Sequence, residues 1–391
     1  MSVLVRESRR PLRWLGRPPR QVLIAAVAGA AVASGPVLYP LWLLSRTRHC
    51  PDPVRPEPPQ GEWPALAVVV PAFREQRVIA VKVADLQANG YPGLLEIIVV
   101  ADDAATAAAA RGTGAYVLEP GRRLGKSAAL NAGVAAATAP LVVFNDANTA
   151  LEPGSLARLV PWFADDRVGA VAGEKRAEAE GHYWRFESWL KRREMRLGST
   201  IGLVGELAAV RADRFRSLPL DVAVDDLWLA LDVAEQGWTV AYEPTSVATE
   251  VDSPSLGQLW ERRTRVVAGA LDVIIRRRNL LVGHPPISAQ LWGHRLLRMT
   301  IGPLAHAALL GWAARRLCQS SRRHPGSALF VVGHAVAGIA IYRASRDRAP
   351  WRWEVLVRQV ALLQAVGLGG LVRYLRGDRP ALWPKPERRA L

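Results

Sequence analysis

LVVFNDANT, residues Leu141–Thr149, is the stretch that decides the fold. Its first four residues are all apolar, which is typical of a strand buried on both faces of a sheet. The strand runs directly into the polar segment NDAN. Open α/β sheets bind ligands at the carboxyl ends of their strands, so Asp146 is a candidate ligand for a hard divalent cation. Asn148, two residues on, projects to the same side. An ordinary Asx turn is the alternative.

Two more short apolar strands precede this one, at Leu66–Val70 and Leu95–Val100. Each is followed by a helix-like or Gly-rich segment, and strands that alternate with helices predict an α/β fold with a mostly parallel sheet. The first strand ends in the segment PAFRE, Pro71–Glu75, and the second ends in Asp102 and Asp103. Three strands therefore bring polar or acidic residues to the same edge of the sheet.

The composition indicates a membrane surface as partner. The chain has 391 residues, half of them hydrophobic, and a net charge of +16 that rests almost wholly on arginine, since only five lysines occur. Nucleic acid and anionic lipid headgroups both attract such a charge. No nucleic-acid motif is present, and the arginines concentrate at the two chain ends beside apolar segments, so we expect a membrane and no nucleic acid. Cys50 and Cys318 form neither a disulfide pattern nor a zinc motif.

The N-terminal part divides into three segments. Residues 1–21 form a basic arm, with six arginines in the first 20 residues. Residues 22–44 carry no charge and are long enough for a transmembrane helix, which needs ~20 residues. Gly35-Pro36 predicts a kink in it. A cleaved signal peptide is the alternative, but the stretch is too long for the apolar part of one and lacks a clear cleavage site. Residues 45–64 follow as a stiff Pro-rich linker.

Five motifs in the middle of the chain carry a family resemblance: VVVPAFRE, VVADDAAT, GKSAALNAG, FNDANT and VGAVAGE. Their order and spacing resemble the family-2 inverting glycosyltransferases, in the membrane-bound branch related to cellulose and hyaluronan synthases. The resemblance implies a GT-A nucleotide-binding domain over residues 65–280, with a mixed, mostly parallel sheet. It also implies a metal-dependent hexosyl transfer, with inversion, from a nucleotide sugar to a lipid or glycan acceptor in the synthesis of cell-envelope polysaccharide or glycolipid.

The resemblance also implies residues for the donor site. The nucleotide sugar would contact Pro71, Ala72, Glu75, Asp102, Asp103, Lys126, Asn131 and Asp146. Asp146 would hold Mg²⁺ or Mn²⁺, and Asn148 replaces the second aspartate that is usual at this metal site. Asparagine offers an oxygen but no charge, so the ion would depend more on the donor's diphosphate.

Adjacent carboxylates, Asp225 and Asp226, precede the apolar-periodic segment Leu227–Ala234. Acidic residues at a helix start can simply cap it. They can also be catalytic, because inverting transfer needs a carboxylate that accepts the proton of the acceptor hydroxyl. Like charges so close would raise one of the two pKa values. In the family the last acidic residue of such a pair is the base, which implies Asp226.

The second half is expected to bind the acceptor and the leaving diphosphate. The residues implied there are Glu206, Arg262, Arg263 and Arg265. The three arginines lie where cellulose and hyaluronan synthases have QxxRW, but Val266 replaces the tryptophan, which argues against processive elongation. Arginines can neutralise a diphosphate; a solvated basic helix is the alternative. Gly202–Arg211 is predicted as a strand. Tyr183–Met195 is predicted as a helix, with Glu187 and Glu194 as solvent-exposed ion-pair partners.

Residues 281–391 contain three apolar stretches: Met299–Ala314, Ser327–Tyr342 and Gln359–Val372. None reaches the ~20 uncharged residues of a full span. Flanking arginines could extend each stretch to the membrane surface, or some stretches lie in the interface. Arginines flank nearly every segment, so the positive-inside rule leaves the orientation open. We expect a multi-pass protein of the cell membrane with its catalytic domain in the cytoplasm, where nucleotide sugars are found.

Two rival hypotheses remain. A nucleotidyltransferase could use a similar α/β fold, but the first strand lacks the Gly-rich, Arg-Lys activating loop of that class. A catalytically silent membrane scaffold is the second rival, and the departures at Asn148, Ala107 and Arg262–Val266 are its evidence. Ala107 stands where the nucleoside loop of the family often has an aspartate. The intact Asp146, Lys126 and Asp226 argue against a scaffold.

Overall fold

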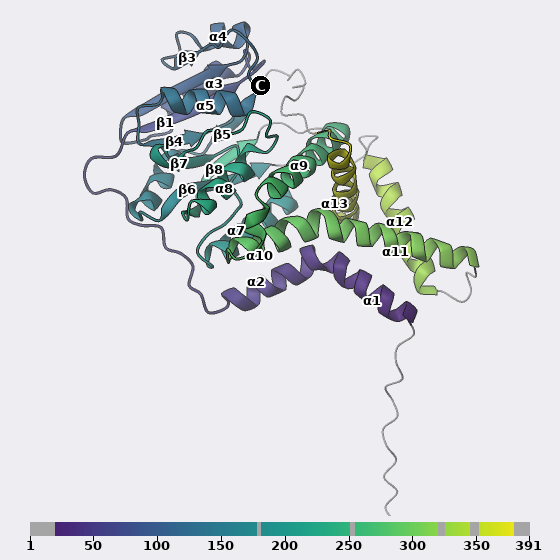
Figure 1. Cartoon of the computed structure of the whole chain (residues 1–391). Coiled ribbons are helices and arrows are strands. Elements are labelled where there is room, and N and C mark those ends of the chain that lie inside the picture. The colour runs from purple at the N-terminus through teal and green to yellow at the C-terminus, as the bar shows by residue number, and fades with distance from the viewer. Residues whose placement is uncertain (1–19, 178–180, 251–254, 320–324, 345–351, 379–391) are drawn as a thin grey trace, which may run out of the picture.

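The computed structural model describes residues 20–177, 181–250, 255–319, 325–344 and 352–378. The basic arm predicted at residues 1–21 lies almost wholly outside this range. In the described part, a sheet with its helices forms one body, and a group of long helices extends to one side of it (Figure 1).

Eight strands form one mixed sheet in the order β3-β2-β1-β4-β7-β6-β8-β5. The strands are β1 Leu66–Ala72, β2 Leu95–Ala101, β3 Tyr116–Leu118, β4 Leu141–Phe144, β5 Thr149–Leu151, β6 Val168–Ala177, β7 Ala208–Arg211 and β8 Thr239–Glu250. The first four strands in this order are parallel to one another, and β6 is parallel to β8. Strand β7 is antiparallel to β4 and β6, and β5 is antiparallel to β8. The prediction of a mixed, mostly parallel sheet is confirmed.

Helices cover the sheet and extend beyond it. They are α3 Ile79–Gln87, α4 Ala104–Ala110, α5 Lys126–Ala136, α6 Ser155–Leu159, α7 Gly181–Met195, α8 Asp225–Glu235, α9 Leu256–Arg276 and α10 Ile287–Gln290. Short 3₁₀ turns occur at η2 Val160–Ala164, η4 Ala212–Arg214 and η5 Arg278–Leu281, and the segment η6 Leu291–Ile301 is a π-helix. Strands and helices alternate over β1 to β4, as the sequence pattern predicts.

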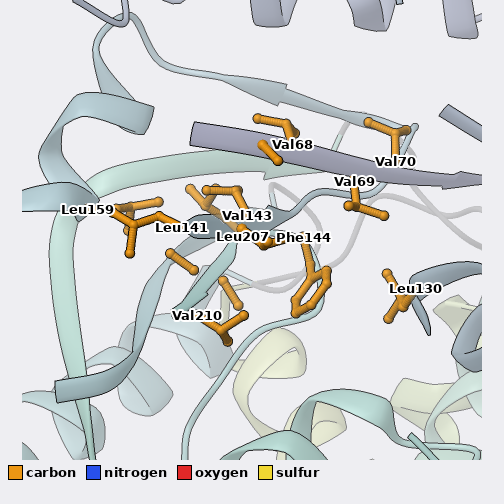
Figure 2. Packing of buried hydrophobic residues seen from close by; sticks show 14 of the residues in the cluster. Val68, Val69, Val70, Leu130, Leu141, Val143, Phe144, Leu159, Leu207 and Val210 are labelled. Carbon is orange, nitrogen blue, oxygen red and sulfur yellow. The ribbon is translucent and has the colours of Figure 1, made fainter. Parts of the chain in front are cut away.

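The centre of the sheet is buried on both faces. Leu66–Val70 of β1 are all 0% exposed, and β4 is buried along its whole length. Figure 2 shows the β1 valines close to Val143 and Phe144 of β4. Burial of one such side chain contributes ~1.5–3 kcal/mol, so these two strands fix the fold and hold their carboxyl ends in place.

One strand prediction is wrong in its length. Gly202–Arg211 was expected to be extended throughout, but β7 contains only Ala208–Arg211. The partner strand β4 has four residues, all of which pair with β7, and the ladder with β6 is shorter still. Leu207 still bonds to β6, because its carbonyl oxygen accepts a hydrogen bond from Gly173 N at 2.9 Å, but the residues before it form a loop with a turn between Leu207 N and Val204 O, 3.2 Å apart.

The first helix is continuous but bent. Helix α1 (Arg20–Ala33), the π-helical turn η1 (Ser34–Leu38) and α2 (Tyr39–Thr47) follow one another without a break. Gly35-Pro36 lies in η1, where Figure 1 shows the bend that the sequence predicts. This helix lies beside α11 (Gly302–Gln319), and α12 (Pro325–Ala344) and α13 (Arg352–Leu375) complete the group.

Two described helices are long and apolar enough to cross a membrane, Ile24–Thr47 and Pro325–Arg343. Only 17% of the first and 6% of the second is buried inside the protein. A core helix of a soluble protein would be mostly buried, so their exposed apolar surface weakly suggests association with a membrane.

The bent helix meets η6 at two glycines. A Cβ on Gly293 would lie 1.9 Å from Cδ2 of Tyr39, and one on Gly35 would lie 2.6 Å from Cα of Arg298. Backbone therefore packs directly against the neighbouring helix at both points, which only glycine permits.

We predict that Gly293→Ala loosens this contact. The added methyl group overlaps the Tyr39 ring, and overpacking of this kind costs about 1–3 kcal/mol, so the thermal midpoint of the detergent-solubilised full chain should fall. Gly311→Ala in α11 is the matched control, because nothing lies within 4 Å of its Cβ position. Equal midpoints for the Gly293 variant and the wild type would contradict the close contact.

Candidate active site

The carboxyl ends of β1, β2 and β4 meet at one edge of the sheet, where Asp102 fixes the loop that enters α5. Its Oδ2 accepts hydrogen bonds from the backbone N–H groups of Leu124 (3.1 Å) and Gly125 (2.7 Å). Its Oδ1 is buried and has no hydrogen-bond partner within the described residues. A buried acceptor without a partner is costly. This oxygen is therefore suited to accept a hydrogen bond from a ligand.

Asp103 plays a different part and caps α4. Its Oδ1 accepts a bond from Thr106 N (2.9 Å), and its Oδ2 accepts bonds from Thr106 Oγ1 (2.7 Å) and Arg74 N (2.6 Å). Arg74 has a φ of +55°, in the left-handed region that non-glycine residues rarely adopt. Glu75 beside it is buried, and its N–H donates to Thr106 Oγ1 (3.0 Å). Asp103 thus holds a strained turn at the end of β1.

Pro71 and Ala72 lie on the last two positions of β1, paired in register with Val100 and Ala101 of β2. They place the backbone of β1 at the edge where Asp102 follows β2. Ala107, by contrast, is completely buried within α4, so it is part of the core.

The ammonium group of Lys126 lies between two carboxylates. Its Nζ is 3.0 Å from Oδ1 of Asp146 and 3.3 Å from Oδ2 of Asp225. Burial lowers the pKa of this lysine, but Asp146, Asp225 and Glu206 outweigh burial and raise it above its usual value. A Cβ on Gly205 would lie 2.9 Å from the same Nζ, so the glycine leaves room for the ammonium.

The neighbouring carboxylates Asp225 and Asp226 differ in their surroundings. Both lie in the first turn of α8, whose N-cap residue is Val224 and makes no side-chain cap. Asp225 pairs with Lys126, whereas Oδ1 of Asp226 accepts a bond from Leu227 N (2.7 Å). Burial, followed by the charge of Asp225, raises the pKa of Asp226 to about 6. Asp226 therefore holds a proton more readily than an ordinary aspartate.

A second chain of charges borders the site. Lys175 of β6 forms ion pairs with Glu206 and with Glu250, the latter at 2.8 Å, and Arg262 binds Glu250 at 2.5 Å. Burial raises the pKa of Glu206, but Lys175 outweighs it, and the net pKa is lowered to about 2. Glu206 is thus held ionised. Nζ of Lys175 also lies 4.8 Å from the ring centroid of Trp184.

The three arginines of α9 point in different directions. Arg262 reaches Glu250, the guanidinium of Arg263 lies 4.1 Å from the ring centroid of Tyr183, and Arg265 is only 8% exposed. Burial lowers the pKa of Arg265 to about 10. A solvated basic helix is therefore the wrong description of Arg262 and Arg265.

The two asparagines that the resemblance places at the donor and metal sites differ in whether their side chains are already hydrogen-bonded. Both ends of the Asn131 amide are bound to the backbone of Leu218, each at 2.8 Å, so this side chain joins α5 to the loop before α8. The amide of Asn131 is therefore already engaged within the protein. Asn148 is half-buried in the turn between β4 and β5, two residues after Asp146.

The expectation for Glu187 and Glu194 is wrong. Both are buried rather than solvent-exposed, with 6% and 0% of their surface accessible. His294 lies between them, with Nε2 2.9 Å from Glu187 and Nδ1 2.7 Å from Glu194. The spacing of seven residues correctly placed both on one face of α7, but η6, a hundred residues later, covers that face.

Several residues next to the site were not identified from the sequence. Lys175 and Glu250 carry the second chain of charges, and Arg295 of η6 lies close enough to lower the pKa of Asp226. Lys175 did leave a signal, because it is a lysine that closely follows the apolar part of the strand VGAVAGEKRA. Nothing local to Arg295 indicates that it faces α8.

The acidic residues at this edge fit a divalent cation whose remaining ligands come from a substrate. Asp146 and Asp225 already hold a positive charge, the Lys126 ammonium, through hard carboxylate oxygens. The described residues contain no group of three histidine, cysteine, aspartate or glutamate side chains that could hold an ion alone. Mg²⁺ and Mn²⁺ are commonly held by one or two carboxylates together with substrate phosphates, which matches this set.

Comparisons with known proteins agree on one family. The family model described as "Glycosyltransferase like family 2" matches residues 64–269. An uncharacterised glycosyltransferase of Mycobacterium tuberculosis is 34% identical over 190 residues, which cover 45% of this chain and 82% of that relative. An N-acetylglucosaminyltransferase of Rhizobium leguminosarum is 24% identical over 233 residues, 52% of this chain and 54% of that relative.

One solved structure resembles the chain over almost its full length. It is the mannosyltransferase of Pyrobaculum calidifontis in complex with GDP-mannose and Mn²⁺, with a TM-score of 0.73 and 27% identity. The match covers 91% of this chain and 99% of that protein. It therefore includes most of the helices outside the sheet.

We predict that Lys175→Met destabilises the fold, because it leaves Glu206 buried without its counter-charge. Loss of one partner of a buried pair costs about 3–5 kcal/mol of unfolding free energy. The double variant Lys175→Met/Glu206→Gln should recover most of the loss, since Glu250 keeps Arg262. Urea unfolding followed by tryptophan fluorescence measures both.

Arg167→Met is the control, because it breaks the exposed pair with Asp165 and should leave stability nearly unchanged. A double variant no more stable than Lys175→Met would contradict the pairing.

Proposed function

The chain belongs to the family-2 glycosyltransferases, and on that premise we propose that it transfers a sugar from a nucleoside-diphosphate sugar to an acceptor at a membrane, with inversion. The observation that carries the proposal is the position of Lys126, Asp146, Asp225 and Asp226 at one edge of the sheet. A cation-binding carboxylate, a lysine and a carboxylate of raised pKa are the groups that this reaction needs.

The donor would bind at the ends of β1 and β2. Oδ1 of Asp102 is available for a hydroxyl or N–H of the nucleoside, and the strained turn at Arg74 keeps the backbone of β1 next to it. Lys126 would leave its carboxylates and turn toward the diphosphate, to which an ammonium binds as a point charge. Arg265 would help to neutralise the departing diphosphate.

Asp146 would hold a divalent cation, with Asn148 as a neutral second ligand. A bound Mg²⁺ or Mn²⁺ supplies charge stabilisation for the leaving diphosphate. The Mn²⁺ in the similar mannosyltransferase supports this assignment.

Asp226 would act as the general base. Its raised pKa makes its carboxylate a better proton acceptor than an ordinary aspartate, while Asp225 is occupied by Lys126. As the acceptor hydroxyl attacks the anomeric carbon, its proton would pass to Asp226 and the sugar–diphosphate bond would break on the opposite side. Glu206, held ionised by Lys175, would orient acceptor hydroxyls.

A membrane site for this reaction is supported by the two exposed apolar helices. We propose that the protein is multi-pass, with its catalytic part in the cytoplasm. The named relatives include a poly-β-1,6-N-acetyl-D-glucosamine synthase of Staphylococcus aureus, 23% identical over 165 residues, 39% of this chain and 40% of that relative. This supports a role in cell-envelope glycan or glycolipid synthesis.

We predict that Asp146→Ala abolishes the metal-dependent part of donor binding, because the cation loses its main protein ligand. Calorimetry with nucleoside diphosphates, with Mn²⁺ and with chelator, measures it. Asp165→Ala, which removes an aspartate whose carboxylate pairs with Arg167, is the control. Metal-dependent binding that is unchanged in Asp146→Ala would remove this residue from the site.

We predict that Asp226→Asn lowers turnover by about 10²–10⁴, the range for loss of a general base. Donor affinity should remain, because the base acts on the acceptor. The wild-type kcat/KM should rise with pH up to about 6 and then level off, since Asp226 must lose its proton to act.

Asp225→Asn removes the like charge that raises this pKa, so the acid limb should move to lower pH while much of the turnover survives. Release of nucleoside diphosphate over a panel of nucleotide sugars gives both profiles. Full turnover in both variants would show that the two carboxylates serve only the helix start.

A further inference from the structure

Two arginines of η6 have N–H groups without an acceptor. Nε of Arg295 and Nη1 of Arg298 are buried, and neither has a hydrogen-bond partner within the described residues. The charges of both arginines act on the hydroxyl of Tyr183 and oppose the rise in its pKa that burial causes, so both side chains lie near this hydroxyl. Buried N–H groups without acceptors are rare in folded proteins, and charged ones are especially costly. Both donors are thus suited to a ligand that brings oxygen acceptors.

The carboxylates near these arginines are already used. Glu187 binds Arg298 with one oxygen and His294 with the other, at 2.9 Å. Glu194 accepts bonds from His294 and Tyr39 on one oxygen and from Thr200 (2.7 Å) on the other. Among the described residues, no carboxylate forms an ion pair with Arg295. The charge of Arg295 contributes to lowering the pKa of Glu187, but the described residues leave Nε of Arg295 without an acceptor.

Aromatic residues and a third arginine complete the region. Arg298 Nη2 donates to the hydroxyl of Tyr183 (3.2 Å), and the guanidinium of Arg263 lies over the ring of Tyr183. Trp184 packs edge-on against Tyr183, with ring centroids 5.3 Å apart. Elements α7, α9 and η6 thus converge here, none of which supplies the donor residues Asp146 and Lys126.

This region adjoins the catalytic carboxylate. The charge of Arg295 acts on Asp226, and the Trp184 ring lies under Lys175, the partner of Glu206. Element η6 also packs against the first apolar helix, through Gly293 against Tyr39 and through the backbone of Arg298 against Gly35. A ligand bound at Arg295 would therefore lie between the proposed base and the helix proposed to enter the membrane.

We propose that Arg295 and Arg298 bind a phosphate group carried by the acceptor. Guanidinium groups match phosphate oxygens in geometry and charge, and two unused N–H groups on one helix offer a two-point site. The inference rests on the proposed sugar transfer and deepens it, because it assigns the acceptor to the phosphate esters. The phosphate belongs either to a lipid headgroup or to a soluble ester.

The test is calorimetric titration of inorganic phosphate into the full-length, detergent-solubilised protein, saturated with nucleoside diphosphate and Mn²⁺. We expect binding to the wild type, and about 10- to 100-fold weaker binding to Arg295→Gln, the range for loss of a charge-assisted hydrogen bond. Arg278→Gln removes an exposed arginine of η5 and should bind phosphate as the wild type does. Arg295 has no described partner to lose, so its variant should fold.

A second arm distinguishes the two sources. The same variants are tested for binding to vesicles of phosphatidylcholine with and without phosphatidic acid. Arg295-dependent binding to phosphatidic acid vesicles alone assigns a lipid phosphate, and Arg295-dependent binding of inorganic phosphate assigns an ester that reaches the site from solution. Binding in neither arm, or equal binding by wild type and Arg295→Gln in both arms, overturns the proposal.

Nucleotide binding separates this inference from the proposed function. If nucleoside diphosphate and Mn²⁺ fail to bind the wild type, the proposed function fails, and phosphate titration without nucleotide still tests Arg295. If saturating nucleotide abolishes phosphate binding, or if Arg295→Gln also loses nucleotide, the arginine serves the donor's diphosphate and the acceptor site is disproved.

Discussion

The ammonium of Lys126 is the interaction on which the candidate site depends. It lies between a carboxylate at the end of β4 and one at the start of α8, two elements far apart in sequence. Without it, Asp146, Asp225, Asp226 and Glu206 would place four like charges in a half-buried region, which is strongly unfavourable. Lys126 therefore joins the sheet to α8, and the same charge would be available to a diphosphate once a metal ion takes its place.

Local sequence was sufficient for the central strands and for the acidic residues that follow them. The limits of β4 were predicted correctly, because a fully buried strand followed by a turn has a simple signature. The charged partners behind this edge were not predictable in the same way. Lys175 and Glu250 are 75 residues apart, and His294 is 100 residues from Glu194. Helical periodicity showed that Glu187 and Glu194 share a face, but not that a π-helix covers it.

The chain is a glycosyltransferase of family 2, which decides between the rival hypotheses. A nucleotidyltransferase is excluded by the family. The scaffold hypothesis relied on residues that depart from the usual motifs of the family. Two of these residues have a structural role in this protein. Ala107 is a core residue of α4, and Arg262 is engaged by Glu250. Asn148 and Val266 are the departures that remain.

The close contact between the first helix and the sheet body would fix the distance between the candidate site and a membrane surface. Tyr39 donates a hydrogen bond to Glu194 at 2.8 Å, and Gly35 allows its helix to approach the backbone of Arg298 closely, so this helix and the sheet body form one unit. In a bilayer crossed by Ile24–Thr47, the reactive centre would neither rise nor tilt relative to the lipid surface. An acceptor anchored in the same leaflet would then search for the enzyme in two dimensions. The length of its headgroup would decide whether it reaches the base. The rigid contact between the first helix and the sheet body would therefore select acceptors by the length of their headgroups.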